Sequence, residues 1–434
     1  MGAGRKMIAM SLYRAATAAG EPVLRLHYRR RAQRGREEAA RLDERFGKAS
    51  QLRPEGPLVW LHAASVGESL SLLPLIDALR QREPGLNLLV TSGTRTSAQI
   101  LSGQLPEGVV HQYNPADCPR WVNRFLDTWR PDLSLYVESE LWPNMLSLTQ
   151  KRGIPTGLLN ARMSEKSYRQ WQRLPSMIRP LMQGFSFCLA QNSTQAKRMA
   201  ALGARDPRPL GNLKFTAKPL AVDETELARM RKALDRRPCW LAASTHPGEE
   251  AVAAEVHAAL KDKHPGLLTL IAIRHPERAE EVLEMLRNRG LRAAQRSLKE
   301  PIEAETDVYL ADTMGEMGLF YRLAPMAFVG GSLTGVGGHN PIEPAHLDCA
   351  ILHGPDMRNF SEVAEDLEEA GASWQVNDGE GLTRALDTLL NEPDSRRNLS
   401  ASAHAVVQGQ AGVLQAVLEE LEPFLAPLRH PRAA

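Results

Sequence analysis

The segment Phe328-Val-Gly-Gly-Ser-Leu-Thr-Gly-Val-Gly-Gly-His-Asn-Pro-Ile-Glu-Pro-Ala345 decides the fold of its half of the chain. The apolar run Met326–Val329 predicts a buried strand, and a helix is expected to begin near Pro341. Between them lies a loop with five glycines, which permit positive φ and close backbone approach. Such a loop before a helix N-terminus is typical of phosphate binding. A Gly-rich turn with a purely structural purpose is the alternative.

The glycine spacing matches neither the dinucleotide fingerprint nor the Walker loop, so a nicotinamide enzyme or an NTPase is not indicated. Glu343, just inside the predicted helix, is placed to accept hydrogen bonds from a ribose. The predicted nucleotide contacts of this loop are Gly337, Gly338, His339, Asn340 and Glu343.

Short β-rich runs alternate with helical patterns in two series, which predicts two parallel sheets with helices on both faces. The predicted strands are Leu58–His62, Asn87–Thr91, Val109–Tyr113, Leu133–Val137, Thr156–Asn160 and Phe185–Ala190, then Cys239–Ala243, Leu267–Ile273, Asp307–Leu310, Met326–Val329 and Ala350–Leu352. Among the predicted helices is a continuous one over Ser164–Met182.

A segment without periodicity, Lys214–Val222, separates the two series. The predicted fold class is therefore α/β, with two Rossmann-like doubly wound domains facing a cleft. The predicted parts are an N-terminal basic, membrane-surface segment 1–48, an acceptor domain 49–214, a linker 215–222, a nucleotide-binding domain 223–415 and a C-terminal helix and tail 416–434.

The composition is that of an ordinary soluble globular protein, with 43% hydrophobic residues, 24% charged residues and a net charge of +2. This balance does not indicate nucleic-acid binding. The four cysteines have no paired spacing, and His246, His275 and His339 lack the spacing of metal ligands. We therefore predict neither a metal site nor a cofactor.

The N-terminal run Met7–Ala19 is mildly apolar, but it is too short and too polar to span a bilayer. From Arg25 to Arg36 there are six arginines and no carboxylate. A helix with apolar positions at Ile8, Leu12 and Val23, followed by these arginines, is suited to an anionic membrane surface. A packed first helix with a solvated basic face is the alternative.

The first predicted strand runs into LHAASVGES, which carries Ser65 and Glu68 where a helix should begin. A carboxylate there can be held near a substrate hydroxyl, as a general base requires. The helix N-terminus is expected to lower its pKa and keep it ionised. A glutamate that only caps the helix is the alternative.

The fourth predicted strand runs into VESELWPN, where Glu138 and Glu140 would be costly to bury unless paired or functional. The chain is expected to leave the sheet here, so that only one of them reaches the cleft. Arg162 in NARMS follows the next strand and is placed to bind an anion or a glutamate. Lys214 in GNLKF and Ser65 are further candidates for acceptor or anion binding. These clusters should converge, because neighbouring parallel strands end at one edge of a sheet.

The second half repeats this arrangement. Ser244 and Thr245 in ASTHPGEE are hydroxyl donors placed to contact a phosphate. Arg274 and His275 in RHPER follow the next strand, and Gly315 in DTMGE follows another. Ordinary loop and helix-cap chemistry is the alternative for each motif. The second domain is thus predicted to hold a nucleotide, and the first an acceptor.

Eight motifs appear in order, from LHAASVGES through VESELWPN, NARMS, GNLKF, ASTHPGEE, RHPER and DTMGE to FVGGSLTGVGGHNPIEPA. Together they resemble the 3-deoxy-D-manno-octulosonic acid (Kdo) transferases of Gram-negative bacteria, from about residue 40 to the C-terminus. The resemblance implies a GT-B glycosyltransferase with a last helix that returns to the first domain. It also implies inverting transfer of Kdo from CMP-Kdo to the lipid A precursor without a nucleotide-bound metal, at the cytoplasmic face of the inner membrane.

On the family pattern Glu68 matches the catalytic base, and one of Glu138 and Glu140 matches an active-site carboxylate. Ser244, Thr245, Arg274 and the loop 330–343 match the CMP site. The N-terminal segment departs from the family, because it is less continuously hydrophobic.

Two other functions share parts of this pattern. Another GT-B enzyme, such as a UDP-sugar transferase or epimerase, would prefer UDP to CMP in a competition test. A non-catalytic nucleotide-sugar-binding protein at a membrane surface would tolerate Glu68→Ala.

Overall fold

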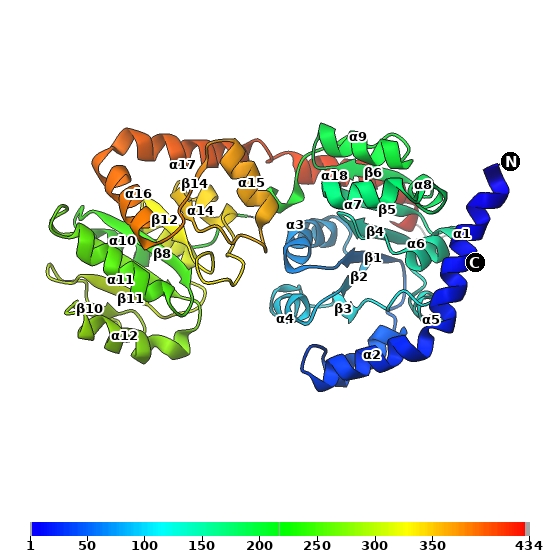
Figure 1. Ribbon diagram of the computed structural model, residues 1–434, viewed down its shortest axis with the longest axis horizontal. Coiled ribbons are helices and arrows are strands. Elements are labelled where there is room, and N and C mark those ends of the chain that lie inside the picture. The colour runs from blue at the N-terminus through cyan, green and yellow to red at the C-terminus, as the bar shows by residue number, and fades with distance from the viewer. Residues whose placement is uncertain (1, 217, 430–434) are drawn as a thin grey trace. The chain divides into compact units, whose positions relative to one another are not determined.

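The computed structural model describes residues 2–216 and 218–429, with side chains from residue 9 onward. Four parts of the predictions lie outside this description: residue 1 of the N-terminal segment, residue 217 of the linker, residues 430–434 of the tail and the side chain of Ile8. The chain forms two compact units (Figure 1), one of residues 1–217 and 410–434 and the other of residues 218–409.

Unit 1 is built on a parallel sheet of seven strands in the order β3-β2-β1-β4-β5-β6-β7. The strands are β1 (Leu58–Ala63), β2 (Asn87–Ser92), β3 (Val110–Tyr113), β4 (Leu133–Val137), β5 (Thr156–Ala161), β6 (Phe187–Ala190) and β7 (Arg208–Pro209). The helices are α1 (Gly2–Ala19), α2 (Glu21–Gln33), η1 (Ala39–Phe46), α3 (Val66–Arg82), α4 (Arg95–Gln104), α5 (Pro119–Trp129), α6 (Pro143–Lys151), α7 (Glu165–Gln172), α8 (Pro175–Gln183), α9 (Ser193–Leu202), η2 (Leu213–Thr216) and α18 (Val413–Arg429).

Unit 2 repeats the plan with seven parallel strands in the order β10-β11-β9-β8-β12-β13-β14. The strands are β8 (Cys239–Thr245), β9 (Leu268–Ile273), β10 (Ala293–Gln295), β11 (Val308–Ala311), β12 (Met326–Val329), β13 (Ala350–His353) and β14 (Ser373–Gln375). The helices are α10 (Glu224–Leu234), α11 (Glu249–Leu260), η3 (Pro276–Arg278), α12 (Ala279–Asn288), α13 (Met317–Leu323), α14 (Ile342–His346), α15 (Ser361–Glu369), α16 (Gly379–Asn391) and α17 (Pro393–Gln408).

Each sheet is buried on both faces, because alternate residues of its strands enter different cores. In β1, Trp60 packs with α5, α6 and α8, whereas Leu61 packs with α3 and α18. In β8, Trp240 joins a core with α11, α12 and α16, and Leu241 joins one with α10 and α13. The predicted strands are confirmed, with ends that differ by at most two residues.

The structure differs from the predicted helices at two places. The single helix expected over Ser164–Met182 is two helices, since Pro175 disfavours helical backbone at the residue before it. The N-terminal helix is likewise divided into α1 and α2 at Gly20. None of the helices in the described part of the chain is long and apolar enough to cross a bilayer.

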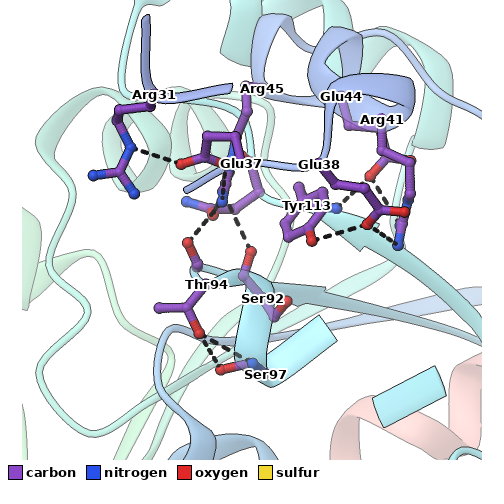
Figure 2. A network of polar contacts seen from close by, with 12 residues as sticks. Arg31, Glu37, Glu38, Arg41, Glu44, Arg45, Ser92, Thr94, Ser97 and Tyr113 are labelled. Carbon is purple, nitrogen blue, oxygen red and sulfur yellow. Dashed lines mark hydrogen bonds and ion pairs between the residues drawn. The ribbon is translucent and has the colours of Figure 1, made fainter. Parts of the chain in front are cut away.

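A buried ionic network attaches η1 to the carboxyl ends of β2 and β3 (Figure 2). The Arg45 guanidinium, 3% exposed, lies 3.0 Å from Glu37 and donates to the Asn114 side chain at 2.7 Å. Glu44 accepts from the Tyr113 N–H at 2.6 Å and pairs with Arg41 at 2.9 Å. The last residues of the predicted N-terminal segment 1–48 are thus fixed to the sheet of unit 1, to which the segment belongs.

Replacing Arg45 with Met should lower the free energy of unfolding by about 1.5–3 kcal/mol, because the buried Glu37 would keep only its pair with Arg31, and Asn114 and Gly93 would lose a charged donor. Lys48→Met removes an exposed pair with Asp43 and should cost less than about 1 kcal/mol. Urea unfolding of the two variants measures the difference, and equal losses would contradict a stabilising role for the buried network.

Candidate functional site

The strand order reverses between β1 and β4 in unit 1, and the motifs that follow these two adjacent strands meet at their carboxyl ends. Ser65 is the N-cap of α3, and its Oγ accepts from the Glu68 N–H at 3.3 Å. In return, Glu68 accepts from the Ser65 hydroxyl and from the Ala64 N–H, both at 2.8 Å. The cap predicted as the alternative role of Glu68 is therefore present, and it fixes the direction of the carboxylate.

Glu138 and Glu140 follow β4. Glu138 adopts a left-handed backbone conformation with φ of 58° and lies 2.7 Å from the Lys214 ammonium. Glu140 accepts from the Trp142 indole N–H at 2.6 Å and lies 3.6 Å from His62 Nε2. Both carboxylates raise the pKa of Glu68, so neither is remote from it.

The pKa of Glu68 is raised from its ordinary value of 4.5 to about 7. Burial is the largest cause, and repulsion from Glu138 and Glu140 adds to it, while the Ala64 and Ser65 hydrogen bonds act in the opposite direction. The lowered pKa expected from the helix N-terminus is therefore wrong. At Glu140 burial alone would raise the pKa, but His62 and Trp142 hold it below its ordinary value.

Lys214 is positioned by a pair of buried asparagines. Asn160, at the end of β5, accepts from the Leu213 N–H at 3.0 Å and donates to the Asn212 side chain at 3.2 Å. The Asn212 side chain in turn accepts from the Lys214 N–H at 3.0 Å. Arg162 follows the same strand and is half-buried. Sequence reasoning did not single out the two asparagines, although both lie in motifs that it quoted.

In unit 2 the strand order reverses between β8 and β12. Ser244 is half-buried with φ of 55°, and the next residue, Thr245, is fully buried. The Thr245 hydroxyl donates to Glu250 at 3.2 Å, so the group expected to contact a phosphate is instead bonded inside the unit. Gly330 is required at the start of the loop, because a Cβ there would lie 2.6 Å from the Ala243 carbonyl oxygen.

The Gly-rich loop is organised by Glu249, a residue that sequence reasoning missed although it stands directly after Gly248. Its carboxylate accepts from the N–H groups of Gly331, Ser332 and Leu333 at 2.7–3.1 Å and from that of His246 at 3.0 Å.

The N–H groups of Gly337, Gly338 and His339 bond to carbonyl oxygens of the same loop, and α14 has only five residues. These amides are satisfied within the protein, contrary to the expectation that they face a phosphate. Gly338 is needed for packing, because its φ is 72° and a Cβ would lie 2.4 Å from Met357 Sδ.

Basic side chains gather beside this loop. His246 and His339 share a hydrogen bond of 2.9 Å between their Nε2 atoms, and the His275 ring lies edge-on to His246 at 5.4 Å. Burial, with the neighbouring positive charges, lowers the pKa of His339 to about 4. Arg274 and His275 are exposed. A bound anion would relieve the mutual repulsion of these groups.

Glu343 is half-buried, and burial raises its pKa to about 7 against the effects of Asn340 and Arg274. Its Oε1 accepts from the Asn340 amide at 3.3 Å. Gly315 lines a separate cavity of about 270 Å³ with Glu226 and Glu316, and Arg296 pairs with both of these carboxylates. Within residues 2–216 and 218–429, no three His, Cys, Asp or Glu side chains are arranged to hold a metal ion.

Two doubly wound sheets, with polar side chains at the point where each strand order reverses, form the GT-B fold. The solved structure of Acinetobacter baumannii MurG shares this fold, with a TM-score of 0.54, 14% identity and coverage of 85% of this chain and 100% of that one.

The family described as 3-deoxy-D-manno-octulosonic-acid transferase (kdotransferase) matches residues 40–217. The 3-deoxy-D-manno-octulosonic acid transferase of Haemophilus influenzae is 36% identical over 394 residues, which cover 89% of this chain and 91% of that protein. A probable mitochondrial Kdo transferase of Arabidopsis thaliana is 35% identical over 395 residues and 88% of each chain. The chain belongs to the Kdo transferase family.

The raised pKa of Glu68 has a consequence for stability. A carboxyl group whose pKa is higher in the folded state contributes stability below its ordinary pKa of 4.5 and loses that contribution as the pH rises through about 7. Glu68→Gln should therefore become more stable relative to the wild type between pH 5 and pH 8. Urea unfolding at both pH values tests this, with the exposed Glu55→Gln as control. A difference that does not change with pH would contradict the raised pKa.

Glu249→Gln should loosen the Gly-rich loop, because an amide has one acceptor oxygen where the carboxylate uses two. We expect the Ser332 and Leu333 amides to exchange with deuterium about tenfold faster or more. The matched control is Glu255→Gln, an exposed glutamate of the same helix. Unchanged protection in the Glu249 variant would show that the carboxylate does not hold the loop.

Proposed function

We propose that this protein transfers Kdo from CMP-Kdo to the lipid A precursor (lipid IVA) with inversion, in the synthesis of the lipopolysaccharide core of a Gram-negative bacterium. Membership of the Kdo transferase family supports the sugar, and the ordered motifs support the donor and the acceptor. The observation that carries the mechanism is the carboxylate of Glu68, which is held by two hydrogen bonds and has a pKa of about 7.

Glu68 acts as the general base. It accepts the proton of the acceptor hydroxyl while that oxygen forms a bond to the anomeric carbon of Kdo and the bond to the CMP phosphate breaks. A pKa near the working pH leaves a large fraction of Glu68 ionised and makes it a stronger base than an ordinary glutamate. Burial sets this raised pKa, repulsion from Glu138 and Glu140 adds to it, and Lys214 lies 2.7 Å from Glu138.

The leaving CMP carries negative charge that must be stabilised. The resemblance implies transfer without a nucleotide-bound metal, so side chains of unit 2 take this role. Arg274, His275 and His339 are the groups best placed for it, because the loop amides are bonded elsewhere. Ser244, Asn340 and Glu343 remain candidates for contacts to the nucleotide.

The acceptor is a lipid, and we propose that the protein works at the cytoplasmic face of the inner membrane as a peripheral or monotopic protein. Leu12, Val23 and Leu26 of α1 and α2 are 65%, 71% and 48% exposed. Arg29, Arg30, Arg34 and Arg36 are exposed on the same segment. Apolar side chains beside basic ones suit an anionic lipid surface.

The first test is to incubate the purified protein with CMP-Kdo, generated in situ, and the tetraacylated lipid A precursor. We expect the lipid to gain the mass of one or more Kdo units, and an excess of CMP to inhibit better than UDP. No mass gain beside an active control enzyme would reject the proposed substrates.

The turnover rate should rise with pH through a midpoint near 7, because only ionised Glu68 accepts the proton. Glu68→Gln should lower kcat by about 10²–10⁴-fold and leave CMP affinity unchanged. Glu55→Gln serves as the control for a charge change at an exposed site. A pH-independent rate, or wild-type turnover in the Glu68→Gln variant, would remove Glu68 from this role.

A further inference from the structure

Helix α6 begins directly after the turn that carries Glu138 and Glu140, and it lacks a cap of its own. Its N-cap residue, Trp142, makes no side-chain capping hydrogen bond. The carboxylate of Asp117, from the loop before α5, takes this role. It accepts from the Asn144 N–H at 3.1 Å and the Met145 N–H at 2.8 Å. A carboxylate at this position satisfies the first amides of the helix and is favoured by its dipole.

The partners of this cap come from α1, more than 100 residues away in sequence. The Tyr13 hydroxyl donates to Asp117 Oδ2 at 2.9 Å, the same oxygen that accepts from Asn144 N–H. The Asn144 side-chain amide donates to the Thr17 hydroxyl at 2.9 Å and to the Asp117 carbonyl at 2.8 Å. One helical turn of α1 therefore holds the first turn of α6.

The turn before α6 is held at both of its ends by different elements. At one end, β4 lies within the core of the sheet. The turn itself is short, and the Leu141 N–H donates to the Ser139 carbonyl at 2.7 Å within it. The Glu138 N–H donates to the Leu159 carbonyl of β5 at 2.9 Å, so a shift of α6 at the other end would chiefly move the carboxylate of Glu140 with respect to Glu68.

We propose that α1 is a positioning element of the transfer reaction: through Tyr13, Thr17 and Asp117 it holds the start of α6, and with it the turn that carries Glu138 and Glu140. This inference rests on the proposed function of Glu68. The same helix carries Leu12, 65% exposed, which can contact a lipid surface while Tyr13 and Thr17 hold α6. In this proposal α1 both holds the turn beside Glu68 and attaches the protein to the lipid surface.

The test uses the full chain with the acceptor dispersed in detergent micelles, so that attachment to a bilayer does not limit the rate. The variants are Tyr13→Phe and Thr17→Val, which each remove one hydroxyl and keep the shape of the side chain. We expect kcat to fall about threefold to tenfold in each, the range for loss of one or two hydrogen bonds, with the KM for CMP-Kdo unchanged. The pH midpoint of kcat should move to lower pH, because Glu140 would repel Glu68 less strongly.

Tyr28→Phe is the matched control. Tyr28 is a half-buried tyrosine of the neighbouring helix α2, and its ring packs edge-on against Phe46. Thermal unfolding of every variant separates loss of fold from loss of positioning. Folded Tyr13 and Thr17 variants with wild-type kcat and pH midpoint would overturn the inference. A wild-type protein without transferase activity would instead reject the proposed function.

Discussion

Burial of charged groups at the carboxyl ends of parallel strands is the constraint on which the rest of this structure depends. When helices cover both faces of a parallel sheet, its functional polar residues lie at the carboxyl ends of the strands. In each sheet these ends flank the two adjacent strands between which the strand order reverses. In unit 1 this places Glu68 beside Glu138 and Glu140, and all three carboxylates must be compensated or protonated. The contacts around the three carboxylates supply this compensation.

The compensation differs from one carboxylate to the next. Glu138 has the Lys214 ammonium, Glu140 has the Trp142 and His62 rings, and Glu68 has only two neutral hydrogen-bond donors. Glu68 has the least compensation, and burial with the repulsion from its neighbours raises its pKa to about 7, at a cost in stability above that pH. In the proposed mechanism, the burial that destabilises ionised Glu68 is also what makes it a suitable base near neutral pH.

In unit 2 the corresponding site has mainly basic side chains, and its one central carboxylate is compensated by backbone amides. Glu249 accepts hydrogen bonds from four backbone N–H groups and so fixes the shape of the Gly-rich loop. Beside this loop lie the basic side chains His246, His275, His339 and Arg274. The positive charge of Arg274 and the N–H donors of the imidazole rings suit an anionic ligand, and burial with the neighbouring positive charges lowers the pKa of His339. The glycines support this arrangement through backbone packing, since their amides are already bonded.

The sequence by itself determined the class of fold, the positions of the main strands, the motifs at their ends and the resemblance to the Kdo transferase family. These features depend on local apolar patterns and on short motifs, which can be recognised from residues that are close together in the sequence. It missed the edge strands β7, β10 and β14, which have only two or three residues each.

Only the tertiary structure decided the pKa of Glu68, the role of Glu249 in the loop and the contact of α1 with the start of α6. Burial and charge repulsion depend on which segments meet in space. Asp117 and Tyr13 are 104 positions apart, and no local pattern relates them.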